Sequence, residues 1–132
     1  MKYIPVLFIF LSCTLQTPTG TKEEVFTWIA DNYVYKDDAS EYWQSPEETL
    51  ERGTGDCEDW AILCVYMLNE INIKANIALI QKPDWDPMVY HAAIWIDGRV
   101  YETRGGKDIT DDYIVKQILS YDAMMFFRIF NT

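Results

Sequence analysis

Basic residues are scarce in this chain of 132 residues, where eleven lysines and arginines stand against 21 aspartates and glutamates. The formal net charge is −10, and no cluster of lysine or arginine interrupts it. Because such a surface repels phosphate groups, the composition argues against nucleic acid and anionic membrane surfaces as partners. A protein or peptide that is neutral or basic where it makes contact is the partner that this charge favours.

Cysteine is also rare, with only Cys13, Cys57 and Cys64 in the chain. No Cys-x-x-Cys pair is present, which argues against a zinc site and against thiol redox chemistry. Cys57 and Cys64 fall on one predicted helix, about 10 Å apart along its axis and too far for a disulfide. The sequence therefore assigns Cys13 to processing, Cys57 to chemistry and Cys64 to the core.

A long apolar run occurs only in residues 1–13, where a single lysine precedes it. It is too short for a stable bilayer anchor and predicts a secretory signal peptide. Phe10-Leu11-Ser12-Cys13 resembles a bacterial lipobox, whose cysteine becomes lipidated; plain signal cleavage and an inner-membrane anchor are the alternatives. Residues 14–20 predict a short tether. We expect a periplasmic or cell-envelope location, with the membrane contacted only through a lipid anchor at Cys13.

The most apolar segment of the remaining chain is residues 57–72, directly after Gly53-Thr54-Gly55-Asp56. Asp56 is a favourable N-cap, and apolar residues on nearly every side predict a buried central helix. Cys57 is its first residue. The unpaired N–H groups and the dipole at a helix start favour negative charge, which would stabilise a thiolate or a nearby oxyanion. An ordinary capped helix with Cys57 as filler is the alternative.

The rest of residues 21–132 predicts one α+β domain, with N-terminal helices and the central helix packed on an antiparallel sheet. Apolar spacing predicts a helix over residues 21–33, and Ser45-Pro46-Glu47-Glu48 predicts the start of another that ends by Gly53. The second half of the domain is predicted as strands at residues 73–81, 89–96 and 99–102, a short helix at 108–119 and a final strand at 123–130.

His91 is the single histidine, so it has to supply any imidazole that activates Cys57. With Asp97-Gly98 as a two-residue turn, Ala93 faces Glu102 and the latter becomes the diagonal neighbour of His91, roughly 7 to 8 Å away. A glutamate side chain can cross that distance. A surface or core histidine without a catalytic role is the alternative.

Three motifs carry a family resemblance. Trp43 to Leu50, the segment Gly53 to Ala61 around Gly-Asp-Cys-Glu-Asp, and His91-Ala92 resemble the transglutaminase-like superfamily, most closely the bacterial transglutaminase-like cysteine proteinases. The resemblance covers about residues 22–105. It implies a papain-like fold with Cys57 as nucleophile and His91 as general base. The family's third residue is usually an aspartate; the matching position holds Glu102, which is longer by one methylene.

The resemblance has two further implications. An aromatic or polar residue upstream of the cysteine often helps to hold the oxyanion, which here would be Trp43 or Gln44, with core packing the favoured alternative for Trp43. Some members bind calcium near the acids that flank the cysteine, and Asp56 and Glu58 match those positions. No other cofactor is implied.

Residue chemistry and resemblance agree on thiol-dependent acyl transfer through Cys57, His91 and Glu102. Release of the acyl group to water gives a peptidase or amidase, and release to an amine gives a cross-linking transglutaminase; the resemblance favours hydrolysis. A binding or structural module that keeps the fold without catalysis is the alternative, with residues 85–90 as its recognition surface.

Overall fold

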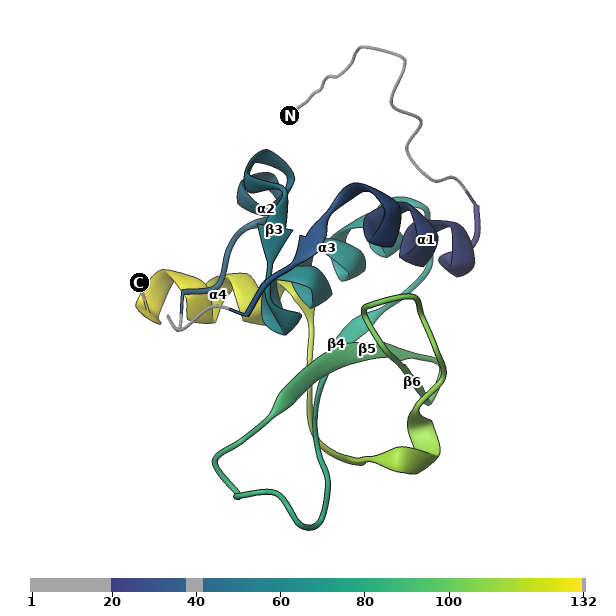
Figure 1. Cartoon of the computed structure of the whole chain (residues 1–132). Helices are drawn as coiled ribbons and strands as arrows, with labels where there is room; N and C mark the ends of the chain where they lie inside the picture. Colours follow the sequence, from purple (N-terminus) through teal and green to yellow (C-terminus); the bar gives the residue numbers. More distant parts are fainter. Residues whose placement is uncertain (1–19, 38–41, 132) are drawn as a thin grey trace.

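The computed structural model describes residues 20–37 and 42–131. The predicted signal peptide, residues 1–13, and residues 14–19 of the predicted tether lie outside this part. The described residues form four α-helices, which lie together on one side of a four-stranded sheet (Figure 1). The predicted α+β class with an antiparallel sheet is confirmed.

Two short helices come first; the second begins at the predicted cap Ser45, and the first begins at a capping box that was not predicted from the sequence. In α1 (Lys22–Asn32), the Thr21 side chain accepts the Glu24 N–H and the Glu24 carboxylate accepts the Thr21 N–H. The helix α2 (Pro46–Arg52) has the same capping box and ends at Gly53, whose φ of +74° favours glycine.

The helix α3 (Cys57–Glu70) is the buried central element that the sequence predicts. The short parallel strands β2 (Val34–Tyr35) and β3 (Thr54–Gly55) pair just before it. The other three helices and strand β5 (His91–Ile96) contact α3, and Figure 1 shows helix α4 in yellow beside it. Side chains from three of its turns, including Ile62, Leu63 and Leu68, are fully buried.

The sheet has the strand order β6-β5-β4-β7 and is antiparallel throughout. Strands β5 and β6 (Arg99–Tyr101) form the predicted hairpin, in which Ile96 pairs with Arg99. Strand β4 (Asn76–Gln81) pairs with β5 on one edge and with β7 (Ile114–Leu119) on the other. Both faces of the sheet are covered by apolar side chains. Because successive residues of a strand point to opposite faces, β5 contributes Ala92 to the face that packs on the helices and Ala93 to the other face.

The predicted helix at residues 108–119 is wrong. The chain makes one 3₁₀ turn, η1 (Thr110–Asp112), and then strand β7, which runs alongside β4. The β-branched residues Ile114, Val115 and Ile118 suit a strand, and pairing satisfies the N–H and C=O groups on the open edge of β4.

The predicted strand at residues 123–130 is also wrong, because these residues belong to helix α4 (Tyr121–Asn131). Ser120 caps this helix, since its Oγ accepts the N–H of Ala123 at 3.1 Å. Alanine and methionine favour helix, and one turn buries Met124 completely against the core. Tertiary contact with α3 thus decides the structure of this segment.

Candidate active site

Cys57 is held at the start of α3 by a reciprocal cap. Asp56 Oδ1 accepts the Asp59 N–H at 3.3 Å, and Asp59 Oδ2 accepts the Asp56 N–H at 3.1 Å. Gly55 precedes this cap, and a Cβ at that position would lie 2.6 Å from the Asp59 Cβ. Only glycine therefore lets the strand β3 lie so close to the first turn of α3.

A pocket of about 440 Å³ lies over Cys57, whose own side chain is 9% exposed. The lining of the pocket includes the carboxyl groups of Asp37, Asp56 and Glu58. The remaining lining is mostly apolar or aromatic and consists of Tyr35, Trp43, Leu79, Met88, Val89, Tyr90 and Ala92. Cys57 thus lies in a cavity whose lining is part acidic and part apolar.

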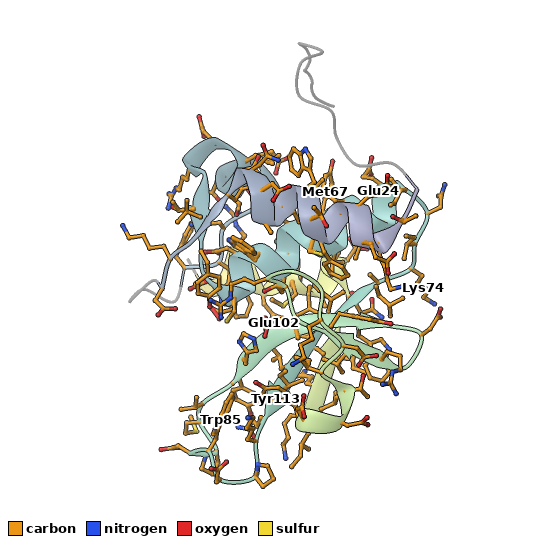
Figure 2. The ribbon with its side chains drawn as sticks, turned by 45° about the vertical axis from the view of Figure 1, so that its right-hand side comes forward. Glu24, Met67, Lys74, Trp85, Glu102 and Tyr113 are labelled. Carbon is orange, nitrogen blue, oxygen red and sulfur yellow. The ribbon has the colours of Figure 1, made fainter. Side chains whose placement is uncertain are left out.

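His91 and Glu102 form a direct pair, as the sequence predicts. The Nε2 atom of His91 lies 3.0 and 3.1 Å from the two carboxylate oxygens of Glu102. Glu102 Oε1 also accepts the Thr103 N–H at 3.0 Å. Burial opposes the charge on Glu102, but the bonds from His91 and Thr103 outweigh it and lower the pKa of this carboxyl. Figure 2 shows Glu102 at the boundary between the helices and the sheet.

The hairpin register explains this pair. Strand β6 ends at Tyr101, so Glu102 follows the strand instead of pairing with Ala93, and the chain turns through a bond from the Glu102 N–H to the Lys107 carbonyl. The turn keeps Glu102 next to His91 on the strand β5. With Nε2 donating to Glu102, the lone pair of the neutral ring is on Nδ1.

The structure brings Cys57 to the same strand but does not bond it to His91. The N–H of Ala92, the residue after His91, donates to the Cys57 sulfur. The thiol itself donates to Glu58 Oε2 at 3.0 Å, and the described residues contain no hydrogen bond between Cys57 and His91. The His91 ring lies 6.4 Å from the Tyr113 ring, on the side of β5 that faces away from α3.

The surroundings of the sulfur favour the neutral thiol. Burial, followed by the negative charge of Glu58, raises the pKa of Cys57 to about 12, although the Ala92 N–H acts in the opposite direction. The helix start alone does not produce the thiolate that the sequence suggests. A base has to remove the proton.

Trp43 and Gln44, the two predicted oxyanion residues, have different positions. Trp43 packs against the core and also lines the Cys57 pocket, so both interpretations of this residue hold structurally. Gln44 is buried: its N–H donates to Asp59 Oδ1 at 2.8 Å and its side-chain oxygen accepts the Thr49 hydroxyl at 3.1 Å. Gln44 therefore supports the first turn of α3 and does not line the pocket.

A comparison with known protein families matches most of this chain. The model of the transglutaminase-like superfamily matches residues 11–103. The chain belongs to the transglutaminase-like superfamily. The resemblance that the sequence motifs carry is thereby confirmed.

Solved structures share the transglutaminase-like fold. Legionella pneumophila LapG, treated with EGTA, has a TM-score of 0.59 and 16% identity, over 81% of this chain and 77% of LapG. Its calcium-bound form has a TM-score of 0.55 and 18% identity, over 80% and 77%. A candidate cysteine protease from Cytophaga hutchinsonii has a TM-score of 0.49 and 20% identity over 68% of this chain, which spans only 36% of that protein. No curated protein matches in sequence.

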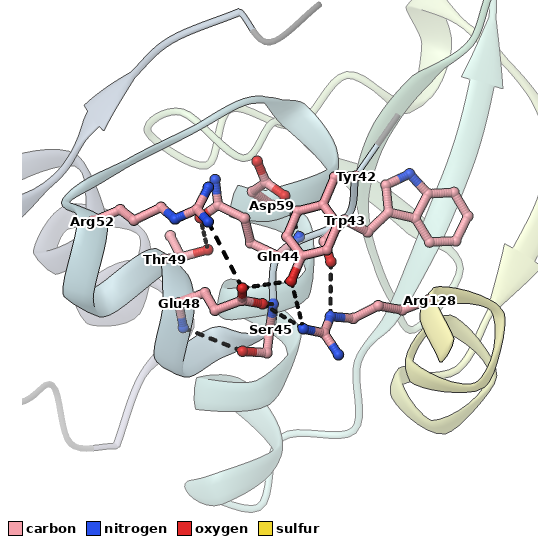
Figure 3. Close-up of polar contacts among 9 residues, drawn as sticks. All are labelled: Tyr42, Trp43, Gln44, Ser45, Glu48, Thr49, Arg52, Asp59 and Arg128. Atoms are coloured by element: carbon pink, nitrogen blue, oxygen red, sulfur yellow. Dashed lines mark hydrogen bonds and ion pairs between the residues drawn. The ribbon is translucent and has the colours of Figure 1, made fainter. Parts of the chain in front are cut away.

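A polar network connects Trp43, which lines the Cys57 pocket, to the last helix (Figure 3). Arg128 of α4 donates from Nε to the Trp43 carbonyl at 2.9 Å and from Nη2 to the Tyr42 hydroxyl at 2.8 Å. Nη2 also donates to Glu48. Burial opposes the charge on Glu48, but bonds from Ser45, Tyr42 and Arg128 lower its pKa to about 2. The sequence misses this network, because Arg128 lies within the segment predicted as a strand.

The acids at the start of α3 repel one another. Burial, Glu58 and Asp59 together raise the pKa of Asp56 to about 7. Carboxylate oxygens are the ligands that calcium prefers, so the donor chemistry of Asp56 and Glu58 suits this ion. Within residues 20–37 and 42–131, no three histidine, cysteine, aspartate or glutamate side chains are grouped closely enough to hold a metal ion.

Proposed function

We propose that this domain catalyses thiol-dependent acyl transfer on amide bonds, as a cysteine peptidase or amidase of a protein or peptide substrate. Cys57 is the nucleophile, His91 the general base and Glu102 the residue that orients the imidazole. The observation that carries the proposal is the His91–Glu102 pair at 3.0 Å, placed one residue from the N–H that meets the Cys57 sulfur. A thiol with a raised pKa needs a base before it can attack, and His91 is the single histidine of the chain.

The proposed reaction follows from these positions. Glu102 accepts the Nε2–H of His91, and Nδ1 takes the thiol proton as the sulfur attacks the amide carbonyl. The N–H of Cys57, unpaired at the helix start, donates to the oxyanion. Trp43 is better placed than Gln44 to supply a second donor, because it lines the pocket. The amine leaves with the proton from His91, and a water molecule then releases the acyl group from sulfur.

This reaction requires a rearrangement at the nucleophile. The thiol has to exchange its hydrogen bond to Glu58 for a contact with His91, whose ring is on the side of β5 that faces away from α3, so the imidazole has to move as well as the thiol. Substrate that enters the pocket beside Glu58 would displace water and favour that exchange.

The test is the rate at which iodoacetamide alkylates Cys57 in the full chain at pH 6 to 9. Peptide mapping by mass spectrometry separates Cys57 from the fully buried Cys64, which serves as internal control. We expect the wild-type protein to be labelled with an apparent pKa below that in His91→Ala, and Glu102→Gln to fall between them. Identical pH profiles in wild type and His91→Ala would contradict the proposal.

The neutral thiol bonded to Glu58 favours a second candidate, a binding module on the same fold without catalysis. In that case Cys57 is labelled slowly in all three proteins and its labelling follows a single high pKa.

A second experiment distinguishes a peptidase or amidase from a transglutaminase. After incubation with a protein substrate and a labelled primary amine, amide cleavage without amine incorporation supports hydrolysis, and incorporation supports a transglutaminase.

Calcium is a proposed ligand, held by Asp56 and Glu58. LapG was solved in a calcium-bound form, and the mutual repulsion of the acids at the start of α3 would be relieved by a cation. When bound, the ion would supply positive charge beside the nucleophile. No step of the reaction depends on it.

Export through residues 1–13 and lipidation at Cys13 are also proposed, which would place the domain in the periplasm or cell envelope. In the described part of the chain, no helix is long and apolar enough to cross a bilayer. The mass of the mature protein tests lipidation: a chain that begins at a diacylated Cys13 is expected, and an unprocessed Met1 would contradict it.

A further inference from the structure

Three consecutive apolar residues are exposed to solvent at the edge of the Cys57 pocket. Met88, Val89 and Tyr90, which follow strand β4, are 84%, 50% and 48% exposed, and all three line the pocket. We name them the apolar lip. Each lies within the same cavity as the nucleophile, so whatever covers them is positioned beside Cys57.

The loop that carries the apolar lip is well anchored. Gln81, buried at the end of β4, donates from Nε2 to the carbonyls of Pro87 at 2.8 Å and Val89 at 2.9 Å. The Met88 N–H donates to Asp86 Oδ1 at 2.9 Å. Trp85 packs edge-on against Tyr113, with ring centroids 5.8 Å apart; Figure 2 shows the two residues near each other at the far end of the sheet.

The anchoring of the loop explains why these apolar side chains remain exposed. Apolar side chains in water cost free energy, and a loop that could fold them inward would do so. The hydrogen bonds from Gln81 instead keep the backbone in the form that presents the lip to the pocket. Contiguous exposed apolar surface at a cavity is typical of a binding surface.

We propose that the apolar lip binds a large apolar side chain of a polypeptide substrate, next to the amide that Cys57 attacks. The pocket lining also includes Asp37, Asp56 and Glu58, so an acidic substrate segment would be repelled. A methionine and a tyrosine suit an apolar or aromatic partner, because the thioether and the ring both make favourable contacts with aromatic groups. This inference rests on the proposed function, since its occupant is the substrate of Cys57.

The test compares two neutral alkylating reagents on the full chain: N-benzyl chloroacetamide and chloroacetyl-glycinamide. Each Cys57 labelling rate is divided by that of glutathione, so that the ratio reports binding alone. We expect wild type to prefer the benzyl reagent by about tenfold. The double variant Met88→Ser/Tyr90→Ser loses most of that preference. Ile118→Ser, which removes an exposed apolar residue of β7 outside the pocket, keeps it.

A wild-type ratio near one, or a preference that survives in the double variant, would overturn the inference. The outcome is distinguishable from failure of the proposed function, because a ratio of two reagents does not depend on activation of the thiol. A benzyl preference that depends on the lip, together with a pH profile unaffected by His91→Ala, would support the lip and reject the catalytic proposal.

Discussion

At the scale of single residues, the most consequential contact is the hydrogen bond from the Cys57 thiol to Glu58. Glu58 accepts the thiol hydrogen bond and contributes the negative charge that, after burial, raises the pKa of Cys57. A carboxylate in this position keeps the thiol protonated until another group neutralises or displaces the carboxylate. The acid beside the cysteine thus acts against reactivity in the ligand-free protein.

Replacement of Glu58 by glutamine tests this. The amide still accepts the thiol hydrogen bond but carries no charge, so the Cys57 pKa should fall. Below the pKa, the thiolate fraction and the alkylation rate rise about tenfold for each pKa unit removed. We expect faster iodoacetamide labelling at pH 8 in EGTA buffer. Glu51→Gln, an exposed acid outside the pocket, is the control with the same change in net charge; equal acceleration in both would show a general charge effect.

At the scale of elements, helix α4 contributes to the site although it is remote from Cys57 in sequence. Arg128 bonds to the Trp43 carbonyl, while Gln44 bonds to Asp59 at the start of α3. The segment that carries Trp43 is therefore fixed from two sides, by α3 and by α4. One wall of the pocket depends on how α4 packs.

A comparison of the variants Arg128→Gln and Arg52→Gln distinguishes the contribution of the Arg128 hydrogen bonds from the effect of removing one positive charge. Both arginines contact Glu48, but Arg52 is 3.9 Å away with 53% of its side chain exposed, and the Trp43 carbonyl is bonded to Arg128 alone among the described residues. We expect Arg128→Gln to lower the free energy of unfolding by about 1.5 to 3 kcal/mol, as for hydrogen bonds to charged groups. Arg52→Gln should cost less than about 1 kcal/mol.

Urea unfolding measures both losses, and pH gives a second readout. The Glu48 pKa is lowered, so its stabilisation is fully present above the unfolded pKa of about 4.3 and is lost as pH falls towards about 2. The difference between wild type and Arg128→Gln should shrink over that range. Equal losses in the two arginine variants would contradict a special role for Arg128.

At the scale of the whole molecule, the raised pKa of Asp56 links the pH dependence of stability to the proposed binding of calcium. Its pKa is raised to about 7 when folded, so between the unfolded value of about 3.9 and 7 the folded state binds more protons. Stability contributed by this group therefore falls as pH rises through that range. A cation at Asp56 and Glu58 would reverse the loss.

We expect calcium to raise the melting temperature more at pH 8 than at pH 5.5, and magnesium to do so less. Asp56→Asn keeps a capping side chain but removes the charge. It should be more stable than wild type at pH 8 in EGTA, and it should lose the calcium response. A calcium response that is the same at both pH values would argue against Asp56 as a ligand.

Local signals allowed much of the fold to be predicted from sequence. Apolar spacing marks α1, a capping box marks α2, and Asp97-Gly98 fixes the hairpin register that brings His91 to Glu102. The last third was predicted wrongly, because the partner of β7 is β4, some 35 residues earlier, and the burial of Met124 depends on α3. Long-range contacts of this kind leave no periodic trace in the segment itself.

The same limit applies to the candidate site. The His91–Glu102 contact follows from a two-residue turn, so the sequence contained enough to predict it. The bond from Cys57 to Glu58 joins sequence neighbours, yet it depends on side-chain rotamers that residue spacing does not report. The bond from Arg128 to Trp43 spans 85 positions and required the fold.

The distance in sequence between Trp43 and Arg128 has a consequence for when the pocket forms. A chain emerging from the ribosome, or crossing a membrane in unfolded form, presents Cys57, His91 and Glu102 well before Arg128. Until the last helix has arrived and docked, the Trp43 wall lacks one of its two attachments. The order of synthesis thus delays the finished pocket until the last helix has been made.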